Sequence, residues 1–388
     1  MKFAHMADCH IGGWRDPKLK ELTIQYFERA IDICIEKNVA FVIIAGDLFN
    51  TSVPSIDLIS RTSSILTKLK DNDIEVYIVP GSHDFSPSGK TMLDVLEKAG
   101  LLHNVFKSKE GKLVYTEDKT GVKLTGVLGL RNNLEKNLFN GLDYLDSEEG
   151  FKVFLFHTTI EEIKPKDMDM VEGQSIDMLP KSFDYYAGGH VHYIYTQKLN
   201  NGVLAYPGPL FPNNFKELEE IKKGGFYIVD DTLNIERIDL NLKEVSNYEF
   251  DVSGKTVDEV EENVLEAITD FKDKIILIRI FGNLRIGKPS DLNLNRFNEY
   301  FKESFSLLIN TNKLKSAEFK EQDLKESFEE IEKEVIGGIE KSERADVLLA
   351  VLDGEKNEAE KSADFENRLF KDFIQNLNLN KLFEDEIK

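Results

Sequence analysis

The sequence has few of the features that mark secreted or membrane proteins. Only two cysteines, Cys9 and Cys34, occur among its 388 residues, too few for the disulfide framework of a small extracellular domain. No apolar run approaches the roughly 20 residues that a membrane-spanning helix needs. The first residues, 1–8, become charged at once, unlike a signal peptide. We therefore expect a cytoplasmic protein.

Positive charge is also scarce. The chain has 49 Lys and Arg against 70 Asp and Glu, which gives a formal net charge of −21. Because nucleic-acid binders usually carry a basic surface, this total argues against a nucleic-acid partner. The imbalance is uneven, since residues 311–388 hold 21 acidic and 13 basic residues, a net charge of −8. A nucleic-acid site elsewhere in the chain therefore stays possible.

The length predicts two to three domains. In residues 1–240, short apolar runs such as Phe41–Ala45 and Val76–Val79 alternate with helical patterns such as Ile56–Leu69. This alternation is typical of parallel strands joined by helices. We predict an α/β fold in which two sheets form a sandwich.

Two further regions follow this α/β domain. Residues 243–305 alternate between strand and helix patterns and predict a small α+β unit. Residues 311–388 contain the amphipathic stretches Glu326–Ile336 and Phe365–Phe373, which predict helices. The pattern leaves two roles open for this helical segment, packing on its own domain or docking a partner.

Polar residues follow five of the predicted strands, at the point where each strand ends. The carboxyl ends of strands are where α/β sheets bind ligands, and five of the seven histidines lie there. Histidine and carboxylate without a thiolate cluster suit Mn, Fe or Zn and do not suit a structural zinc site. The residues at these points are Asp8, His10, Asp47, Ser82, His83, Asp84, His157, His190 and His192.

Two of these segments carry pairs spaced two residues apart, Asp8 with His10 and His190 with His192. On extended backbone, residues i and i+2 share a face, so we expect each pair to point the same way and Cys9 to point into the core. A lone pair of this kind is usually incidental, but five segments in strand-end register are not. His5 and His103 fall outside the pattern, and we expect them to be structural.

These motifs resemble the calcineurin-like metallophosphoesterase superfamily, whose pattern is D-x-H, G-D, G-N-H-D/E, H and G-H-x-H. Within it, the chain resembles the meiotic recombination eleven nuclease family, the SbcD-like subunit of a double-strand-break repair complex, in its archaeal form. The resemblance is strong over residues 1–240 and weak over 243–305. It rests on Gly46-Asp47-Leu48-Phe49, Leu130-Arg131-Asn132-Asn133, Gly188-Gly189-His190-Val191-His192, Tyr206-Pro207-Gly208-Pro209 and residues 225–229.

The resemblance implies two manganese ions per subunit, which clamp a phosphate and activate a water molecule. It makes His83 the catalytic histidine, with Asp84 orienting the ring of His83. The first ion would be held by Asp8, His10, Asp47 and His192, and the second by Asp47, Ser82, His157 and His190.

Two residues depart from the family pattern. Ser82 stands where the family has Asn, and because a serine hydroxyl reaches less far than an amide oxygen, we expect a weaker second metal site. Asn50 stands where the family often has His, which puts a substrate-turning role at that position in doubt. Candidate DNA contacts are Asn50, Arg131, Arg15, Lys18 and Lys20, and the four charged residues among them are more often plain surface charges.

The activity that the resemblance implies is a Mn-dependent DNA nuclease, with 3′-to-5′ double-strand exonuclease and single-strand endonuclease activities, in double-strand-break repair and homologous recombination. It further implies a homodimer through the helices at 56–69 and 92–102 and DNA capping by residues 243–305. An SMC-like (SbcC-like) ABC ATPase would dock on residues 311–388, and the protein would associate with the nucleoid when on DNA. Two alternatives stay open: a small-molecule phosphodiesterase or phosphatase, and a DNA-end tethering scaffold with weak catalysis.

Overall fold

A computed structural model describes residues 1–86, 90–164, 173–316 and 371 of the chain. Residues 1–315 form one compact unit, and the description below concerns that unit. None of the helices described is long and apolar enough to cross a membrane. The stretches at 326–336 and 365–373, predicted as helices, lie outside the described residues, except for Lys371, which is helical.

Two six-stranded sheets build the larger part of this unit, which confirms the predicted α/β sandwich. The first sheet runs β14 (Ile235–Leu240), β13 (Gly224–Asp230), β1 (Lys2–Met6), β2 (Phe41–Ala45), β3 (Glu75–Val79) and β4 (His103–Asn104). The second runs β11 (Ile194–Leu199), β12 (Gly202–Pro207), β10 (Tyr185–Gly189), β9 (Lys152–His157), β8 (Lys123–Val127) and β7 (Thr116–Glu117). A short hairpin, β5 (Ser108–Lys109) and β6 (Lys112–Leu113), stands apart from both sheets.

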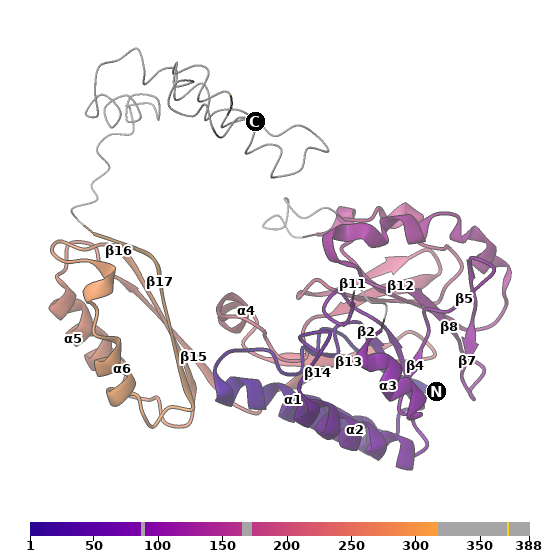
Figure 1. Cartoon of the computed structure of the whole chain (residues 1–388), viewed down its shortest axis with the longest axis horizontal. Helices are drawn as coiled ribbons and strands as arrows, with labels where there is room; N and C mark the ends of the chain where they lie inside the picture. Colours follow the sequence, from indigo (N-terminus) through magenta and orange to yellow (C-terminus); the bar gives the residue numbers. More distant parts are fainter. Residues whose placement is uncertain (87–89, 165–172, 317–370, 372–388) are drawn as a thin grey trace, which may run out of the picture. The chain divides into compact units, whose positions relative to one another are not determined.

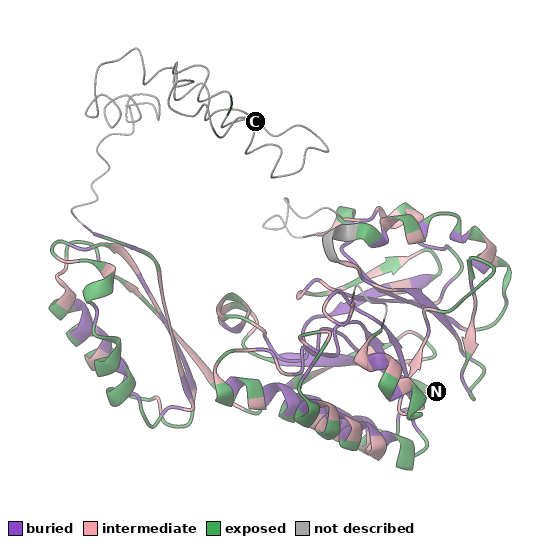
Figure 2. Cartoon of the chain, viewed as in Figure 1, coloured by how far each residue is buried: buried purple, intermediate pink, exposed green. Residues whose placement is uncertain are grey.

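The two sheets pack face to face through aromatic and aliphatic side chains. Phe3 of β1 stacks on Phe41 at 5.1 Å and meets Tyr185 of the second sheet edge-on at 5.3 Å between ring centroids. The strands β1, β2 and β3 are parallel neighbours, as are β8, β9 and β10. Their apolar runs are buried on both faces, as parallel strands require (Figure 2). Their carboxyl ends therefore reach one edge of the sandwich.

Helices cover the outer faces of the sandwich. Along the first sheet lie α1 (Pro17–Glu36), α2 (Ile56–Asp71) and α3 (Met92–Lys98), as Figure 1 shows. Asp16 caps α1 by accepting hydrogen bonds from the first-turn amides, and Pro17 begins the helix. The outer face of the second sheet packs against two 3-10 helices, η1 (Arg131–Phe139) and η2 (Leu142–Ser147). Shorter turns are η3 (Glu161–Ile163) and η5 (Ile176–Met178).

The α+β unit after residue 243 contains one more strand than the sequence predicted. Its parallel sheet consists of β15 (Val245–Asp251), β16 (Ile275–Asn283) and β17 (Ser306–Lys315), with α5 (Val257–Ala267), η6 (Pro289–Asp291) and α6 (Leu294–Tyr300). The predicted boundary at 305 is therefore too early, and residues 311–315 are sheet, not part of the helical segment. The second half of β17 is polar and partly exposed, so it lacks the apolar signal of a strand.

His5 is a buried histidine in β1 whose titration affects stability. Its Nδ1 lies 2.9 Å from the Tyr185 hydroxyl, and burial lowers its pKa to about 3. In the unfolded chain His5 takes up a proton near pH 6.5, whereas in the folded chain it stays neutral. The free energy of unfolding therefore decreases as the pH falls below about 6.5. At about pH 5 this costs on the order of 2 kcal/mol.

We expect His5→Gln to flatten this part of the pH profile. Urea unfolding with a metal chelator present should show a smaller loss of stability between about pH 7 and pH 5 in the variant than in the wild type. His103→Gln, at a partly exposed histidine paired with Glu75, is the control. Equal acid sensitivity in all three proteins would refute this role of His5.

Candidate metal centre

The loops that follow β1, β2, β3, β9 and β10 meet at the carboxyl edge of the sandwich. Backbone hydrogen bonds join the first two loops, from the amide of Asp8 to the carbonyl of Gly46 at 3.2 Å and from His10 to Asp47 at 2.9 Å. The extended backbone predicted for the two spaced pairs is wrong here, since Asp8, His10 and His190 have φ values of 50°, 42° and 88°. Such left-handed conformations are uncommon outside glycine and cluster at functional sites. Cys9 is buried in the core, as expected.

Asp8, His10 and His192 form the first group of side chains at this edge. Their nearest ligand atoms all lie within 4.8 Å of one another. The Nε2 atoms of His10 and His192 face each other at 3.1 Å, and His192 Nε2 lies 3.6 Å from the Asp8 carboxylate. Two imidazole nitrogens and a carboxylate that converge on one point are a typical divalent-metal ligand set.

Asp47 joins two further groups, one with Asp8 and His157 and the other with His10 and His83. One Asp47 oxygen lies 3.2 Å from Nε2 of His157, and the other accepts the backbone N–H of His83 at 2.8 Å. Asp47 is thus the side chain that connects the loops, as a bridging ligand would. The structure brings the predicted residues Asp8, His10, Asp47, His83, His157 and His192 together.

His190 and Ser82 lie beside these groups without belonging to them. The ring of His190 is 5.1 Å from the ring of His157, and its backbone N–H donates to Asp8 at 3.0 Å. Burial lowers the pKa of His190 to about 4, which keeps its imidazole neutral, the form that binds metals. Ser82 is buried in the loop after β3.

The histidine tautomers fit metal binding. Nδ1 of His157 lies 2.7 Å from the carbonyl of Ala45, and because a carbonyl only accepts, Nδ1 carries the proton. Nε2 of His157 is buried and lies 3.2 Å from the Asp47 carboxylate, so it is the nitrogen that a metal ion would take in place of a proton. Metal-binding histidines are held in this way through their other nitrogen.

Electrostatics at this edge favour cations. Burial opposes ionisation of Asp8 and Asp47, yet the surrounding histidines hold the pKa of both carboxyls below its usual value. Burial lowers the pKa of His157 and of His192, but the neighbouring carboxylates outweigh this effect. Asp47 raises the pKa of His157 to about 9, and Asp8 raises that of His192 to about 10. Protons on these rings balance the buried carboxylates, and divalent cations would replace them.

The predicted link between Asp84 and His83 is wrong. The Asp84 carboxylate accepts the backbone N–H groups of Leu48, Phe49 and Gly81 at 3.1–3.2 Å, so it fastens the loop after β2 to the loop after β3. The ring of His83 has a different partner, because its Nδ1 lies 2.8 Å from the carbonyl of Asn50. Burial, with Asp47 nearby, raises the pKa of Asp84 to about 7. In this structure the Asp84 carboxylate thus holds the two loops together.

Asn50 takes the orienting role that the sequence assigned to Asp84. Its backbone carbonyl lies 2.8 Å from Nδ1 of His83, while its side-chain oxygen accepts from Asn213 at 3.3 Å. Because any residue supplies a carbonyl, no side-chain motif could have indicated this contact. The hydrogen bond leaves Nε2 of His83 available for chemistry.

Glu217 contacts the candidate metal site, and sequence reasoning missed it. It lies on α4 (Phe215–Glu220), and its Oε1 is 2.9 Å from Nδ1 of His192. The two residues are 25 positions apart and share no spacing motif, so only the folded chain shows the pair.

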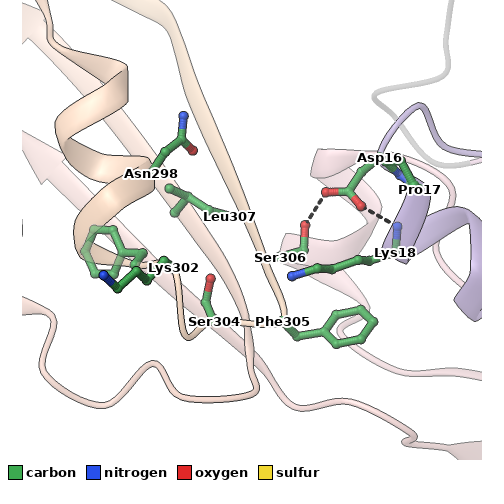
Figure 3. Close-up of a pocket in the computed structure, with 10 residues that line it drawn as sticks. Asp16, Pro17, Lys18, Asn298, Lys302, Ser304, Phe305, Ser306 and Leu307 are labelled. Atoms are coloured by element: carbon green, nitrogen blue, oxygen red, sulfur yellow. Dashed lines mark hydrogen bonds between the residues drawn. The ribbon is translucent and has the colours of Figure 1, made fainter.

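The predicted DNA contacts lie at several places. Lys18 lines a pocket of about 390 Å³ between the start of α1 and the α+β unit, where its ammonium is 5.8 Å from the ring centroid of Phe305 (Figure 3). Arg15 and Lys20 are exposed near the same helix start. Arg131 begins η1, and its side chain lies outside the described part of the chain.

Comparison with known proteins agrees with this geometry. Residues 1–193 match the sequence model of the calcineurin-like phosphoesterase family. The chain is 27% identical over 292 residues to the "DNA double-strand break repair protein Mre11" of Archaeoglobus fulgidus, covering 69% of this chain and 65% of that protein. The protein of the same name from Methanococcus maripaludis is 29% identical over 302 residues, covering 71% and 77%.

The chain thus spans just under two thirds of the length of the Archaeoglobus fulgidus protein. Among solved structures, a dimetal phosphatase from Danio rerio covers 59% of this chain and 91% of its own, with 10% identity and a TM-score of 0.39. That likeness is too low to support an argument, and the fold assignment rests on the sheets and the family match.

Proposed function

We propose that this chain, whose residues 1–193 form a calcineurin-like phosphoesterase domain, is a divalent-metal-dependent DNA nuclease of double-strand-break repair. The observation that carries the proposal is the convergence of four histidines on two buried carboxylates at the edge of the sandwich. The name of the curated relatives, DNA double-strand break repair protein, supports DNA as the substrate.

The proposed ligands follow from the geometry and the family pattern. Two bound divalent cations, manganese in this proposal, would polarise the scissile phosphate and supply a hydroxide near neutral pH. Asp47 would contribute to both metal positions. The first position is completed by Asp8, His10 and His192, and the second by Ser82, His157 and His190.

His83 is proposed to act on the leaving group. Its Nδ1 is held by the carbonyl of Asn50, and a ring nitrogen lies within 4.8 Å of ligand atoms of His10 and Asp47. His83 therefore stands beside the proposed ligands, with Nε2 free to give a proton to the leaving oxygen or to stabilise its charge.

Local charge reconciles DNA binding with the acidic chain. Asp8 and Asp47 are the only formally charged residues among the proposed ligands, so two dications leave the site positive. A phosphodiester responds to this local field and not to the total charge of −21. DNA binding by this subunit alone should be weak, metal-dependent and sensitive to salt.

The test compares substrates and metals. A labelled DNA hairpin and a labelled duplex end are incubated with Mn²⁺ or Mg²⁺, beside a nitrophenyl phosphodiester. We expect DNA cleavage with Mn²⁺ that a chelator abolishes. Cleavage of the small ester alone would instead select a small-molecule phosphodiesterase, and DNA binding without any cleavage would select a tethering scaffold.

The finer activities and partners belong to the same proposal. We assign 3′-to-5′ exonuclease and single-strand endonuclease activity to the metal site, and DNA capping to the α+β unit after residue 243. An SMC-like ABC ATPase is the proposed partner of residues 316–388, nearly all of which lie outside the described part of the chain.

Ser82 gives a prediction about the second metal. We expect Ser82→Asn to tighten binding at that position, because the amide oxygen reaches further than the hydroxyl. Calorimetric titration with Mn²⁺ should show a weak and a tight site in the wild type and two tighter sites in the variant. Two equally tight sites in the wild type would contradict this prediction.

A homodimer is proposed through α2 and α3. Each helix exposes one apolar side chain, Ile56 at 85% and Val95 at 50% exposure, and a second copy of the chain could cover both. Light scattering at micromolar concentration should give twice the 44.3 kDa of one chain, and Ile56→Glu with Val95→Glu should lower it. A single 44.3 kDa species in the wild type would argue against the dimer.

A further inference from the structure

The short helix α4 lies between the metal centre and the α+β unit and contacts both. We infer that α4 is the support that positions His192 for metal binding, through Glu217, and that the α+β unit holds this support in place through Arg279. The inference rests on the proposed function, because it assigns a role to residues around the same metal site. In this inference Glu217 is a positioning residue, and Arg279 helps to hold the helix that carries Glu217.

Glu217 is itself held rigidly. Its Oε2 accepts the backbone N–H of Asn213 at 2.7 Å, and the side-chain amide of Asn214 donates to its Oε1. The same Oε1 is 2.9 Å from Nδ1 of His192. The carboxylate is 15% exposed, against 59% for Glu220 on the same helix. Because Asn213 and Asn214 both donate to the Glu217 carboxylate, this carboxylate has a fixed position and can orient the ring of His192.

The Glu217 contact determines which nitrogen of His192 is free. A carboxylate oxygen accepts hydrogen bonds, and Oε1 of Glu217 lies 2.9 Å from Nδ1 of His192. Nδ1 of His192 must then carry the proton, and Nε2 faces Asp8 and His10. A carboxylate behind a metal-binding histidine fixes the tautomer and raises the basicity of the ligand.

A helix of six residues is not stable by itself, so α4 depends on contacts elsewhere. Asn214 caps it by accepting the N–H of Glu217 at 3.0 Å, and Leu218 is fully buried in the core beneath α1. The third contact comes from β16 of the α+β unit. Arg279 donates Nε and Nη2 to the two oxygens of Glu219 at 2.8 and 2.5 Å, and its guanidinium lies 5.1 Å from the ring centroid of Phe215.

The spacing of the two glutamates explains how one helix serves both sides. Residues i and i+2 lie about 200° apart around a helix of 3.6 residues per turn. Glu217 therefore faces the metal centre while Glu219 faces the α+β unit. The pair of Glu219 and Arg279 is bidentate and only 14% and 17% exposed, so it is stronger than an ordinary surface ion pair.

The first experiment measures metal affinity, not activity. Mn²⁺ is titrated into the full chain and followed by calorimetry and by the electron paramagnetic resonance of free Mn²⁺. We expect Glu217→Ala to weaken the tighter site about 10- to 100-fold. Glu217→Gln keeps an oxygen that can accept from Nδ1 and should lose less. Glu220→Ala and Glu220→Gln, exposed on the same helix, are matched controls.

The second experiment tests the anchor. Glu219→Gln and Arg279→Gln should each weaken the same site several-fold, with Glu220→Gln again unchanged. The two variants combined should lose no more than either alone, because they break one contact. The exchange Glu219→Arg with Arg279→Glu should recover much of the affinity. Melting temperatures in a chelator show whether each variant is folded.

The outcomes separate the two proposals. If wild type binds no divalent metal, the proposed function fails. If wild type binds metal and Glu217→Ala matches its Glu220 control, the positioning role of Glu217 is overturned and the function stands. If Glu217 matters but both variants of the ion pair match the control, the link to the α+β unit is overturned.

Discussion

Replacing His83 by alanine is expected to stop hydrolysis while metal binding stays intact. Removal of a positioned general acid typically costs about 10²- to 10⁴-fold in rate, and His83 is not among the proposed metal ligands. Its backbone N–H would still donate to Asp47, because the substitution changes only the side chain. Single-turnover cleavage of labelled DNA, together with Mn²⁺ titration, measures both quantities on one preparation.

The control for this variant is His103→Ala, at a partly exposed histidine paired with Glu75. It should cleave DNA at the wild-type rate. Cleavage by His83→Ala at that same rate would remove His83 from the reaction. Loss of both metal and activity would show instead that His83 is a metal ligand. This outcome is tested because a ring nitrogen of His83 lies within 4.8 Å of ligand atoms of His10 and Asp47.

Replacing Asp47 by alanine is expected to remove both metal binding and activity. Asp47 lies in two of the three ligand groups and also receives the N–H of His83. Its loss should exceed the about 100-fold that an outer partner of a metal ligand costs. Inductively coupled plasma mass spectrometry after dialysis against Mn²⁺ measures the metal bound per chain.

Asp57→Ala, on the exposed side of α2, loses the same charge and should change neither quantity. The Asp47 variant should keep less than half of the metal that the wild type retains. Full metal content in Asp47→Ala would show that the two positions do not share this carboxylate.

Sequence alone could locate the loops of the metal site because buried parallel strands can be recognised from their apolar runs. Apolar runs such as Phe41–Ala45 and Val76–Val79 mark buried parallel strands, and parallel strands end at one edge. A polar residue directly after such a run is therefore placed in space by its position in the chain. Asp47, which follows β2, and His157, which ends β9, were found in this way.

The contacts that orient the site could not be found in this way. The ring of His83 is held by a backbone carbonyl, that of Asn50, and every residue has one. Glu217 reaches His192 only because α4 folds against the loop after β10. Asp84 has the family position but binds three backbone amides. Orientation depends on side-chain direction in irregular loops, which periodicity does not report.

Irregular backbone and mixed strands explain the remaining differences. The loop carrying Asp8 and His10 adopts left-handed conformations that an extended-strand rule does not allow for. The strand Ser306–Lys315 begins with apolar residues and ends with polar ones, so its second half read as part of the following segment. In both cases, tertiary hydrogen bonding overrides the local pattern.

The most direct measurement is anomalous X-ray diffraction from crystals of the chain grown with Mn²⁺, with data collected on both sides of the manganese absorption edge. Two anomalous peaks are expected about 3.5–4 Å apart. One should lie among Asp8, His10 and His192, the other should lie beside His157 and His190, and Asp47 should stand between the two. A single peak, or none at this edge of the sandwich, would contradict a dimetal nuclease site.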